Sequence, residues 1–340
     1  MAEHEAPDSD KADIERALVV WGLAPAGRPL AMARLTGGVS SDIWKVDLPS
    51  GPVCVKRALA RLRVAAVWHA PVERNAYEVA WLRTAATIVP GAVPTVRAAS
   101  AELGLFLMDY LPPATYPPWK ALLRDRQADP RTAAAVGERL GRIHAATADK
   151  AEIAARFPTD AIFHSIRLDP YLLATAARHP DRAGALRDLV DVTARTKRVL
   201  VHGDVSPKNI LVGPRGPVFL DAECAWYGDP AFDVAFCLNH LLLKCLWTPT
   251  ARDGFLSSFD ALAMAYLAEV RWESPVALEE RIARLLPGLL LARVDGKSPV
   301  EYIETESDKT VVRRVGRALL ARPVARLAQV RDCWKEAIAS

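Results

Sequence analysis

The pattern of hydrophobic and polar positions changes about a third of the way along the chain. In the first third, short apolar stretches separated by turn residues predict five β-strands, over 29–34, 41–48, 52–58, 93–98 and 105–109. Helical spacing predicts a short amphipathic helix over 10–21 and one main helix over 71–87. We therefore expect a small α+β lobe that contains a five-stranded antiparallel sheet.

The rest of the chain reads as mainly helical. Residues 111–118 contain four prolines, which restrict the backbone and remove hydrogen-bond donors, so this segment predicts a stiff connector. We place the domain boundary there, with an N-terminal lobe over 1–111 and a larger C-terminal lobe over 112–340. Residues 1–10 are expected to be a disordered leader. Asp129 followed by Pro130 is typical of a helix start, and apolar residues then recur at helical spacing.

Composition excludes several classes of protein. The 340 residues are 51% apolar and 25% charged, unlike a disordered or collagen-like chain. A net charge of +4, from 44 basic and 40 acidic residues, is too balanced for a nucleic-acid-binding protein. The start of the chain lacks the apolar core of a secretion signal, and no uncharged apolar run is long enough to cross a membrane. Five cysteines without a Cys-x-x-Cys pair favour the reducing cytoplasm over a disulfide or zinc framework.

One segment in the second half, 199–221, has a clear β pattern and carries the candidate chemistry. Residues 210–212 and 218–220 are apolar, and the turn residues between them predict a hairpin. If residue 212 faces 218, then Asn209 faces Asp221 at the open end of the hairpin. An amide oxygen and a carboxylate side by side suit Mg²⁺ that carries nucleotide phosphates. Asp204 lies on the loop that enters the same hairpin.

This segment resembles a known family. The run His202-Gly-Asp-Val-Ser-Pro-Lys-Asn209, followed by Asp221, is similar to the catalytic loop and metal-binding Asp of the protein-kinase-like fold. Gly203 after the His, Glu223 after the metal Asp, and the run 228–233 (Gly-Asp-Pro-Ala-Phe-Asp) resemble the small-molecule branch. That branch is the aminoglycoside phosphotransferase family, which includes choline, methylthioribose and homoserine kinase-like enzymes. The resemblance implies a two-lobed fold.

The resemblance also implies roles for individual residues. Asp204 is the expected catalytic base, and Asn209 and Asp221 are the expected Mg²⁺ ligands. The residues expected to support them are His202, which shapes the loop; Ser206, at the position where protein-serine kinases place a phosphate-binding lysine; Glu223, which could reach a second metal or the substrate; and Asp229 or Asp233, which would tie the loop to the C-terminal lobe. Lys208 is either a nearby cation for the phosphates or a solvated surface lysine.

The nucleotide site is expected in the N-terminal lobe. Lys56 is the only charge in the apolar run 53–56, where kinase-like folds place their phosphate lysine, and Lys45 is the alternative. A buried lysine needs a counterion, which Glu78 or, less favourably, Glu73 would supply. The remaining nucleotide-binding candidates are Gly37, Gly38, Ser40 and Ser41 in a loop over the phosphates, and Met108, Asp109 and Tyr110 in a hinge beside the purine.

The acceptor is much less defined by the sequence. Candidate contacts are Trp226, Tyr227, Asn239, His240, Arg293 and Asp295, and residues 163–170 could form a wall of the site. Basic and acidic residues are balanced after residue 250, which favours a neutral sugar or an amino alcohol over a polycationic antibiotic. We expect a cytoplasmic kinase, monomeric or homodimeric, that uses ATP (or GTP) and Mg²⁺ to phosphorylate a small-molecule hydroxyl. The alternatives are an aminoglycoside kinase that confers antibiotic resistance and a regulatory pseudokinase.

Overall fold

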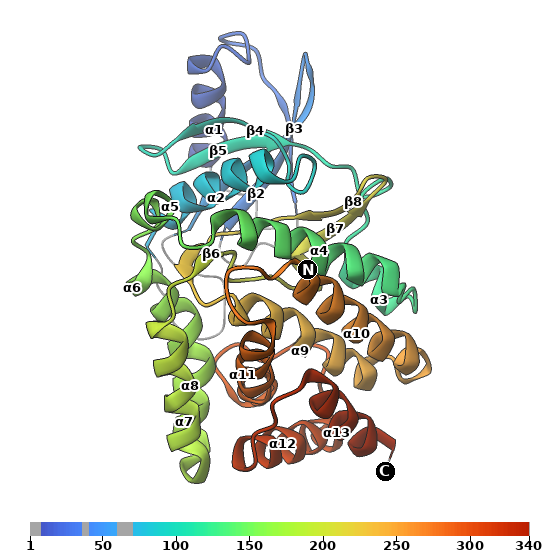
Figure 1. The fold of residues 1–340 in the computed structure, drawn as a ribbon. Helices are drawn as coiled ribbons and strands as arrows, with labels where there is room; N and C mark the ends of the chain where they lie inside the picture. Colours follow the sequence, from blue (N-terminus) through green and yellow to red (C-terminus); the bar gives the residue numbers. More distant parts are fainter. Residues whose placement is uncertain (1–7, 36–40, 60–70, 340) are drawn as a thin grey trace.

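The computed structural model describes residues 8–35, 41–59 and 71–339. Within this part of the chain, a small lobe built on a sheet lies above a larger, mainly helical lobe (Figure 1). The two-lobed α+β fold expected from the sequence is therefore confirmed. The expected leader lies outside the described residues up to residue 7, and residues 8–10 belong to the first helix instead.

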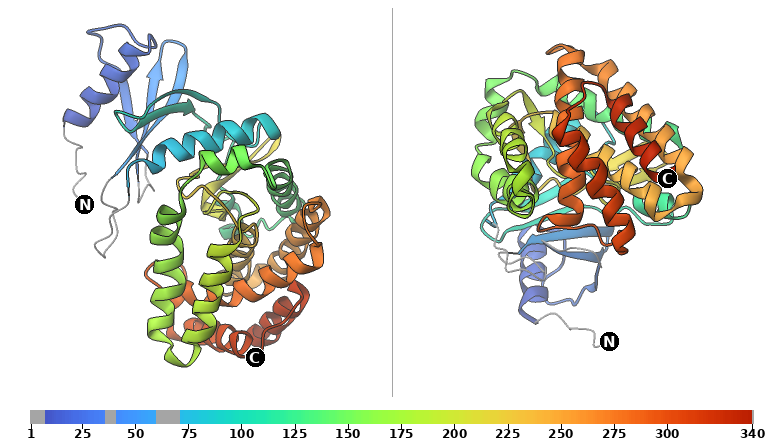
Figure 2. Two further views of the ribbon diagram at one scale, coloured as in Figure 1. Left: turned by 60° about the vertical axis from the view of Figure 1, so that its left-hand side comes forward. Right: turned by 90° about the horizontal axis from the view of Figure 1, so that it is seen from below.

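The N-terminal lobe contains a five-stranded antiparallel sheet among the described residues, in the order β1-β2-β3-β5-β4. Its elements are α1 (Asp8–Val20), β1 (Ala31–Arg34), β2 (Ser41–Leu48), β3 (Gly51–Ala58), α2 (Arg74–Ile88), β4 (Val96–Ser100) and β5 (Leu105–Asp109). Ile14 and Leu18 of α1 are buried against Trp44 and Val46 of the sheet. Helix α2 lies between the sheet and the helical lobe (Figure 2).

Strand β4 begins three residues later than the sequence pattern predicts. Gly91 adopts φ +81°, a left-handed conformation that glycine tolerates, so the apolar residues around it form a turn after α2. The pairing of β4 with β5 is also irregular between Val96 and Ala98. Apolar composition alone does not distinguish such a turn from the start of a strand.

Helices dominate the C-terminal lobe, which surrounds one continuous core. Its helices are α3 (Trp119–Arg124), α4 (Pro130–Thr147), α5 (Ala151–Arg156), α6 (Asp160–Phe163), the π-helix η1 (His164–Leu173), α7 (Ala174–Arg178), α8 (Ala183–Arg195), α9 (Ala231–Trp247), α10 (Arg252–Glu269), α11 (Pro275–Asp295), α12 (Glu306–Ala321) and α13 (Leu327–Ala339), with short 3₁₀ turns η2 (Pro180–Arg182), η3 (Pro207–Asn209) and η4 (Pro249–Ala251). Asp129 accepts a hydrogen bond from the backbone N–H of Arg131, which caps α4 as expected.

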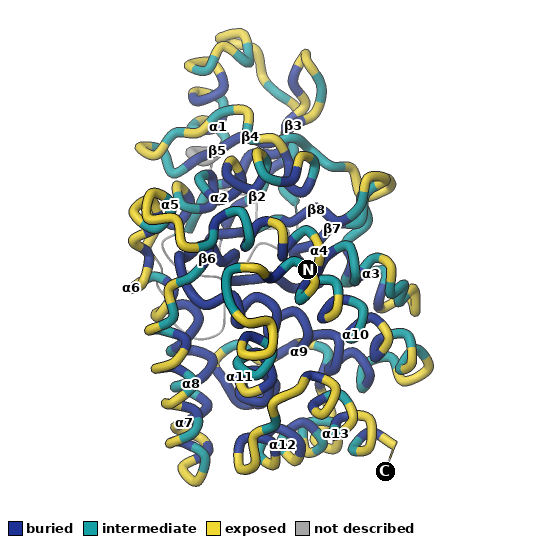
Figure 3. The backbone as a smooth tube through the Cα atoms, viewed as in Figure 1, coloured by how far each residue is buried: buried dark blue, intermediate teal, exposed yellow. Residues whose placement is uncertain are grey.

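Helix α9 runs through the middle of this lobe, and its residues 231–245 are all buried (Figure 3). It packs against α10 and α11, so it is a core helix surrounded by protein. Among the described residues, no helix has the length and apolar character needed to span a bilayer.

Two short antiparallel strand pairs support the loop that contains Asp204. Strands β6 (Val199–Val201) and β9 (Trp226–Gly228) pair below it, and β7 (Ile210–Gly213) pairs with β8 (Gly216–Phe219). The predicted hairpin register was wrong by one residue, because Val212 faces Pro217 rather than residue 218. The turn contains two residues rather than five, and Gly216 after it takes φ +101°. Leu220, not Asp221, therefore lies opposite Asn209, and its N–H donates to the Asn209 carbonyl over 2.9 Å.

Candidate active site

Asp233 attaches the loop that contains Asp204 to the helical lobe. Its two carboxylate oxygens each accept a backbone N–H bond of 2.7 Å, one from His202 and one from Gly203. Asp233 is fully buried in the first turn of α9, where its charge is also favoured by the helix dipole. The sequence left Asp229 and Asp233 as alternatives for this role, and these contacts favour Asp233. Asp229 caps the start of α9 through the N–H of Ala231 and pairs with Arg281.

His202 holds the shape of this loop through both ring nitrogens. Its Nδ1 accepts the backbone N–H of Asp204 over 3.1 Å, so Nε2 carries the proton and donates to the carbonyl of Leu220, also over 3.1 Å. Burial lowers the pKa of this imidazole, which favours the neutral form that the two bonds require. The edge of the ring packs against Trp81, with the ring centroids 4.6 Å apart. These contacts link the Asp204 loop to the hairpin and to α2.

Gly203 is required at its position for two separate reasons. Its φ is +80°, in the left-handed region that residues with a side chain rarely adopt. A Cβ at this position would lie 2.5 Å from the carbonyl oxygen of Cys224, which is closer than atoms can pack. The glycine that follows His202 in the sequence motif is therefore a geometric requirement of the loop.

Asp204 lies at the centre of the site, buried between two cations. The Arg167 Nη2 is 3.0 Å from its Oδ2, and the Lys208 Nζ is 3.5 Å from the same oxygen. Arg167 comes from the π-helix η1, and its Nε donates to the carbonyl of Gly203 over 2.5 Å. Sequence reasoning placed residues 163–170 near the site but missed Arg167. The signal was an arginine between two apolar residues, Ile166 and Leu168.

Asn209 and Asp221 supply oxygen atoms beside Asp204. The Asn209 amide nitrogen donates to the carbonyl of Asp204 over 3.1 Å, which leaves its Oδ1 as an acceptor or ligand. Asp221 takes φ +67°, a conformation that turns the chain out of β8. An amide oxygen and a carboxylate are hard ligands, so this donor set fits Mg²⁺ with water and phosphate oxygens as the remaining ligands. No larger cluster of His, Cys, Asp or Glu side chains suited to a metal occurs among the described residues.

Lys56 joins the two lobes. On β3 it is almost fully buried, 2.7 and 2.8 Å from the two carboxylate oxygens of Glu78 on α2, and it also contacts Asp221 directly. Burial alone would lower the pKa of this ammonium, but Asp221 and Glu78 raise it above its usual range. Burial raises the pKa of the Glu78 carboxyl to about 7, although Lys56 opposes the shift. The charged lysine is thus available where nucleotide phosphates would meet Asp221.

The structure favours Lys56 over Lys45 and Glu78 over Glu73 as the buried ion pair. Lys45 pairs with Asp47 on its own strand over 2.9 Å and lies 5.6 Å from the centre of the Tyr110 ring. Glu73 is exposed at the start of α2. The buried hydroxyl of Ser41 has no hydrogen-bond partner among the described residues. Gly37, Gly38 and Ser40, the other candidates in that loop, lie outside the described residues.

The remaining candidates on the nucleotide side differ in their contacts. Glu223 accepts a 3.0 Å bond from the Nε of Arg74 on α2, so it links the lobes rather than pointing free toward a metal. The Ser206 hydroxyl, beside Asp204, is buried and has no hydrogen-bond partner in the described part of the chain. Met108 and Asp109 close strand β5, with the Asp109 N–H donating to Thr95, and Tyr110 follows as the chain leaves the sheet. A hinge role for these three residues remains a prediction.

The acceptor candidates divide into two groups. Trp226 stacks on Phe163 with centroids 4.1 Å apart and donates to Asp160, while Asp295 is held by His179 and Arg313, each over 2.8 Å. Tyr227 bonds backbone groups at residues 147, 150 and 198. These three residues have structural partners within the lobe, and their contact with the acceptor stays a prediction.

Asn239, His240 and Arg293 remain as candidates. His240 is bonded to the Tyr302 hydroxyl over 2.9 Å, and Arg293 Nη1 donates to the Tyr171 hydroxyl over 3.0 Å. Asn239 Oδ1 and Arg293 Nε are buried atoms without a hydrogen-bond partner in the described residues. Such atoms are available to a bound molecule.

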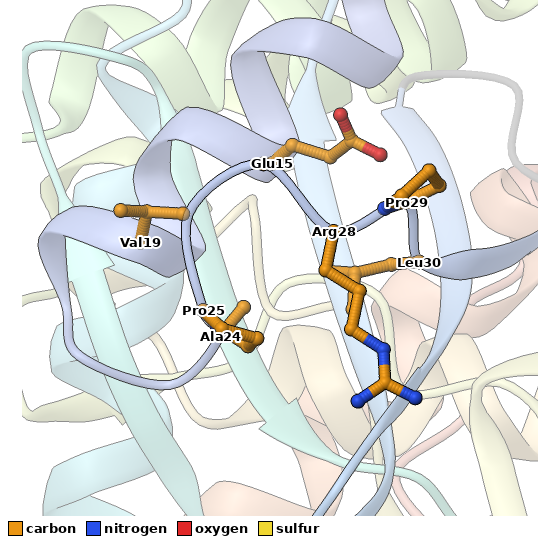
Figure 4. Close-up of a pocket in the computed structure, with 8 residues that line it drawn as sticks. Glu15, Val19, Ala24, Pro25, Arg28, Pro29 and Leu30 are labelled. Atoms are coloured by element: carbon orange, nitrogen blue, oxygen red, sulfur yellow. The ribbon is translucent and has the colours of Figure 1, made fainter.

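Two hollows of the surface lie apart from this chemistry. One, of about 220 Å³, lies between α1 and residues 24–30, which lead to β1, and is lined by Glu15, Val19 and Arg28 among others (Figure 4). The other, of about 440 Å³, lies between α8, α11 and α12 and is mostly apolar. Neither is lined by Lys56, Asp204 or Asp221.

Comparison with known proteins connects this geometry to a group of enzymes. Methylthioribose kinase from Geobacillus sp. (strain WCH70) is 26% identical over 263 residues, which cover 67% of this chain and 64% of that kinase. The chain thus spans just under two thirds of the length of this curated relative.

Solved structures share the fold at lower identity. A choline/ethanolamine kinase family protein from Mesorhizobium loti has a TM-score of 0.52 and 16% identity, covering 96% of this chain and 94% of its own. An amicoumacin kinase solved with AMP-PNP, Ca²⁺ and Ami has a TM-score of 0.53 and 14% identity, covering 95% and 98%. A family profile, described as the phosphotransferase enzyme family, matches residues 32–272. That match extends over both lobes and includes Lys56 and the whole Asp204 loop, so the chain belongs to the phosphotransferase enzyme family.

Proposed function

We propose that the protein is a small-molecule kinase that transfers the γ-phosphoryl group of ATP to a hydroxyl, with Mg²⁺ as the metal. The observation that carries this proposal is the convergence of Asp204, Asn209 and Asp221 with the Lys56–Glu78 pair between the lobes. Phosphoryl transfer requires a positioned hydroxyl, fixed cations for the phosphates and oxygen ligands for a metal. This one group of residues can position the hydroxyl, supply the cations and hold the metal.

Asp204 positions the acceptor in the proposed reaction. Its carboxylate accepts a hydrogen bond from the acceptor hydroxyl and orients the oxygen toward the γ-phosphorus. A bond forms between that oxygen and phosphorus while the bond from phosphorus to the β-phosphate oxygen breaks. The products are a phosphate ester and ADP, and the hydroxyl proton passes to Asp204 and then to solvent.

Fixed cations stabilise the charge that spreads over the phosphate oxygens. Lys56 is held by Glu78 in a buried position, so it acts without having to be ordered during the reaction. Lys208 lies beside Asp204 and half exposed, which suits a cation that meets the transferred group. When bound, Mg²⁺ held by Asn209 and Asp221 would neutralise phosphate charge and align the phosphate chain.

The comparisons support this proposal. Methylthioribose kinase is similar to this chain in sequence, and the amicoumacin kinase of similar fold was solved in complex with AMP-PNP, an ATP analogue. A regulatory pseudokinase is disfavoured because Lys56, Asp204, Asn209 and Asp221 are all present. Such a protein commonly lacks one of the groups that the chemistry needs.

The test is an ADP-release assay over a panel of neutral, cationic and anionic hydroxyl compounds, with ATP and Mg²⁺. We expect steady ADP release with at least one acceptor, and its loss in Asp204→Asn. Asp332→Asn, an exposed aspartate on α13, is the matched control and should behave as wild type. No acceptor-dependent ADP release from any compound would contradict the proposal, as would full activity in Asp204→Asn. An acceptor found only among aminoglycosides would instead favour the antibiotic-resistance alternative.

A further inference from the structure

Five cations from five different elements gather on the side of Asp204 away from the N-terminal lobe. This cation cluster consists of Lys120 on α3, Arg167 on η1, Lys208 on η3, Lys244 on α9 and Arg293 on α11. His240 lies among them. Burial lowers its pKa well below the usual range, and Arg293, Lys244, Lys208 and Lys120 lower it further. The imidazole is therefore neutral and adds no further positive charge to the cluster.

Two of these cations face the same pair of aromatic rings. The Arg167 guanidinium lies 5.7 Å from the centre of the Tyr171 ring and 5.8 Å from that of Phe236. The Arg293 guanidinium lies 5.4 Å and 5.9 Å from the same two centres. The rings stabilise both charges but do not neutralise them. Two like charges held this close together favour an anion between them or beside them.

The cluster also contains buried donors without a hydrogen-bond partner. The side-chain nitrogen of Lys244 is buried, with 1% of the residue exposed, and lies 4.3 Å from the centres of the Trp247 and Tyr302 rings. Neither this atom nor Arg293 Nε has a hydrogen-bond partner in the described part of the chain. Leaving such donors unpaired is costly, and a bound anion would satisfy them.

Helix α9 connects these donors to the reaction centre. Asp233 holds the Asp204 loop, and Phe236, His240 and Lys244 follow on the same face at helical spacing. At 1.5 Å per residue, Lys244 lies roughly 12 Å along the axis from Phe236. A molecule with its hydroxyl at Asp204 could thus place a second group near Arg293 or, if longer, near Lys244.

Carboxylates do not balance the cluster. Among the described residues, Asp204 forms ion pairs with Arg167 and Lys208, and Glu301 pairs with Lys120. No described carboxylate forms an ion pair with Lys244 or Arg293. Positive charge therefore predominates on the acceptor side, which the balanced composition of the C-terminal region does not reveal.

We infer that the acceptor is an anionic hydroxyl compound, in which a carboxylate or phosphate group binds Arg293 or, in a longer molecule, Lys244 while the hydroxyl meets Asp204. This inference rests on the proposed kinase function. It replaces the neutral sugar or amino alcohol expected from composition, and a polycationic antibiotic does not fit the same charges.

The test uses matched acceptors that differ in charge. The anions are 4-hydroxybutyrate and glycerol 3-phosphate, their neutral counterparts are 1,4-butanediol and glycerol, and choline and kanamycin are the cations. Two measurements are made at constant ionic strength: ADP release with ATP and Mg²⁺, and the Tm shift that each compound causes without ATP. The variants are Lys244→Met and Arg293→Met, and the matched controls are Lys335→Met and Arg178→Met at exposed positions.

We expect at least one anion to be phosphorylated with a lower KM than its neutral counterpart and to raise Tm. A charge-assisted hydrogen bond contributes about 1.5–3 kcal/mol, so at least one of the two cluster variants should raise the KM for the anion about 10- to 100-fold. The two controls should leave it unchanged. A lower KM and a larger Tm shift with glycerol 3-phosphate would indicate that the acceptor carries a phosphate group. The same result with 4-hydroxybutyrate would indicate a carboxylate.

These measurements distinguish a wrong acceptor charge from a wrong kinase assignment. ADP release with only neutral or cationic acceptors would overturn the anionic acceptor and leave the kinase intact. A Tm shift by an anion that is lost in Lys244→Met, without ADP release from any compound, would support the anion site and contradict the kinase. Anions that have neither effect, or equal effects on wild type and both cluster variants, would overturn the inference.

Discussion

Arg167 contacts both Asp204 and the loop that holds it: its Nη2 is 3.0 Å from the Asp204 carboxylate, and its Nε donates to the carbonyl of Gly203. One side chain thus fixes the position of the proposed base relative to its own backbone. Arginine suits this role because its planar fork presents several donors in fixed directions. Arg167 acts through Asp204, and we regard it as a positioning residue.

Replacing Arg167 should therefore lower kcat more than it changes the KM for ATP. Arg167→Met loses both the charge and the bond to Gly203, and we expect a fall in kcat of about 10- to 100-fold, the size of one or two lost charge-assisted bonds. Arg167→Lys keeps the charge and should recover part of the rate. Steady-state kinetics of the two variants, with Arg178→Met as control, check this. Equal kcat in all four proteins would remove the positioning role.

Asp204→Asn should separate chemistry from nucleotide binding. The amide keeps the size of the side chain but cannot take the hydroxyl proton, and the loss of a general base costs about 10²–10⁴-fold in kcat. Lys56, Asn209 and Asp221 are untouched, so the affinity for ATP should stay near that of wild type. Isothermal titration with AMP-PNP, together with kcat, gives both quantities. Retention of more than about a tenth of kcat would argue against the base role.

Lys56→Ala and Asp221→Ala should impair different steps. Lys56 offers a fixed cation to the phosphates, so its loss should raise the KM for ATP and lower turnover. Asp221 is a proposed metal ligand, so its loss should leave almost no activity at any Mg²⁺ concentration, as should removal of Mg²⁺ from the wild type with EDTA. Activity measured over a range of Mg²⁺ concentrations distinguishes the variants. Full rescue of Asp221→Ala by millimolar Mg²⁺ would show that the metal assignment is wrong.

Gly203→Ala should destabilise the fold around the Asp204 loop. An added Cβ meets the Cys224 carbonyl at 2.5 Å, and the backbone is in the left-handed region, so both effects oppose the substitution. Left-handed backbone alone costs roughly 1–2 kcal/mol for a residue with a side chain. The free energy of unfolding measured in urea should fall by at least this amount. Gly184→Ala is a suitable control, because a Cβ there meets no atom within 4 Å.

Lys244 should make the stability of the protein depend on pH. Burial, with a smaller effect of Lys120, lowers the pKa of Lys244 to about 7 from 10.5, while Glu301 opposes the shift. Between about pH 7 and 10.5 the unfolded chain binds a proton here that the folded protein does not, so this group's contribution makes stability rise with pH across that window. The titratable rings near Lys244 do not cancel this pH dependence of stability. His240 is neutral, and burial keeps the Tyr302 phenol protonated.

Lys244→Met should therefore be more stable than wild type at pH 7, by up to roughly 4 kcal/mol for a shift of this size. The difference should shrink as the pH rises toward 10. Urea unfolding of both proteins at several pH values measures it, with Lys335→Met as a control that shows no such trend. A variant less stable than wild type at pH 7 would mean that the ammonium is paired in solution. If the variant is instead more stable, as expected, the cation cluster carries a cost in stability that ligand binding offsets.

The sequence predicts the parts of the site that lie close together in the chain. Asp204, Asn209 and Asp221 fall within one loop and hairpin, so motif spacing places them together even though the predicted register was wrong by one residue. Lys56 and Glu78 could be paired because a lone charge in an apolar strand needs a partner on the next helix.

Contacts between distant segments could not be predicted in this way. Arg167 lies 36 residues before Gly203, in a helix whose period the apolar pattern does not show. The sequence offered Arg293 as one of several acceptor candidates, but Lys244 reads as an ordinary charge near the end of a helix until the packing of α9 against α11 brings both near His240. The charge of the acceptor side is thus a property of the tertiary structure rather than of composition.

The π-helix that carries Arg167 makes the site sensitive to chain length. At its end the Ala174 N–H donates to the carbonyl of Asp169, five residues back, so this hydrogen bond spans one residue more than in an α-helix. Deleting one residue, such as Ser165, would let the segment relax to α-helical hydrogen bonding and rotate Arg167 relative to Asp204 without altering either side chain. A shortened relative could therefore keep every residue of the Asp204 loop and still present a different surface to its acceptor, so a gap in this turn would signal a change of substrate.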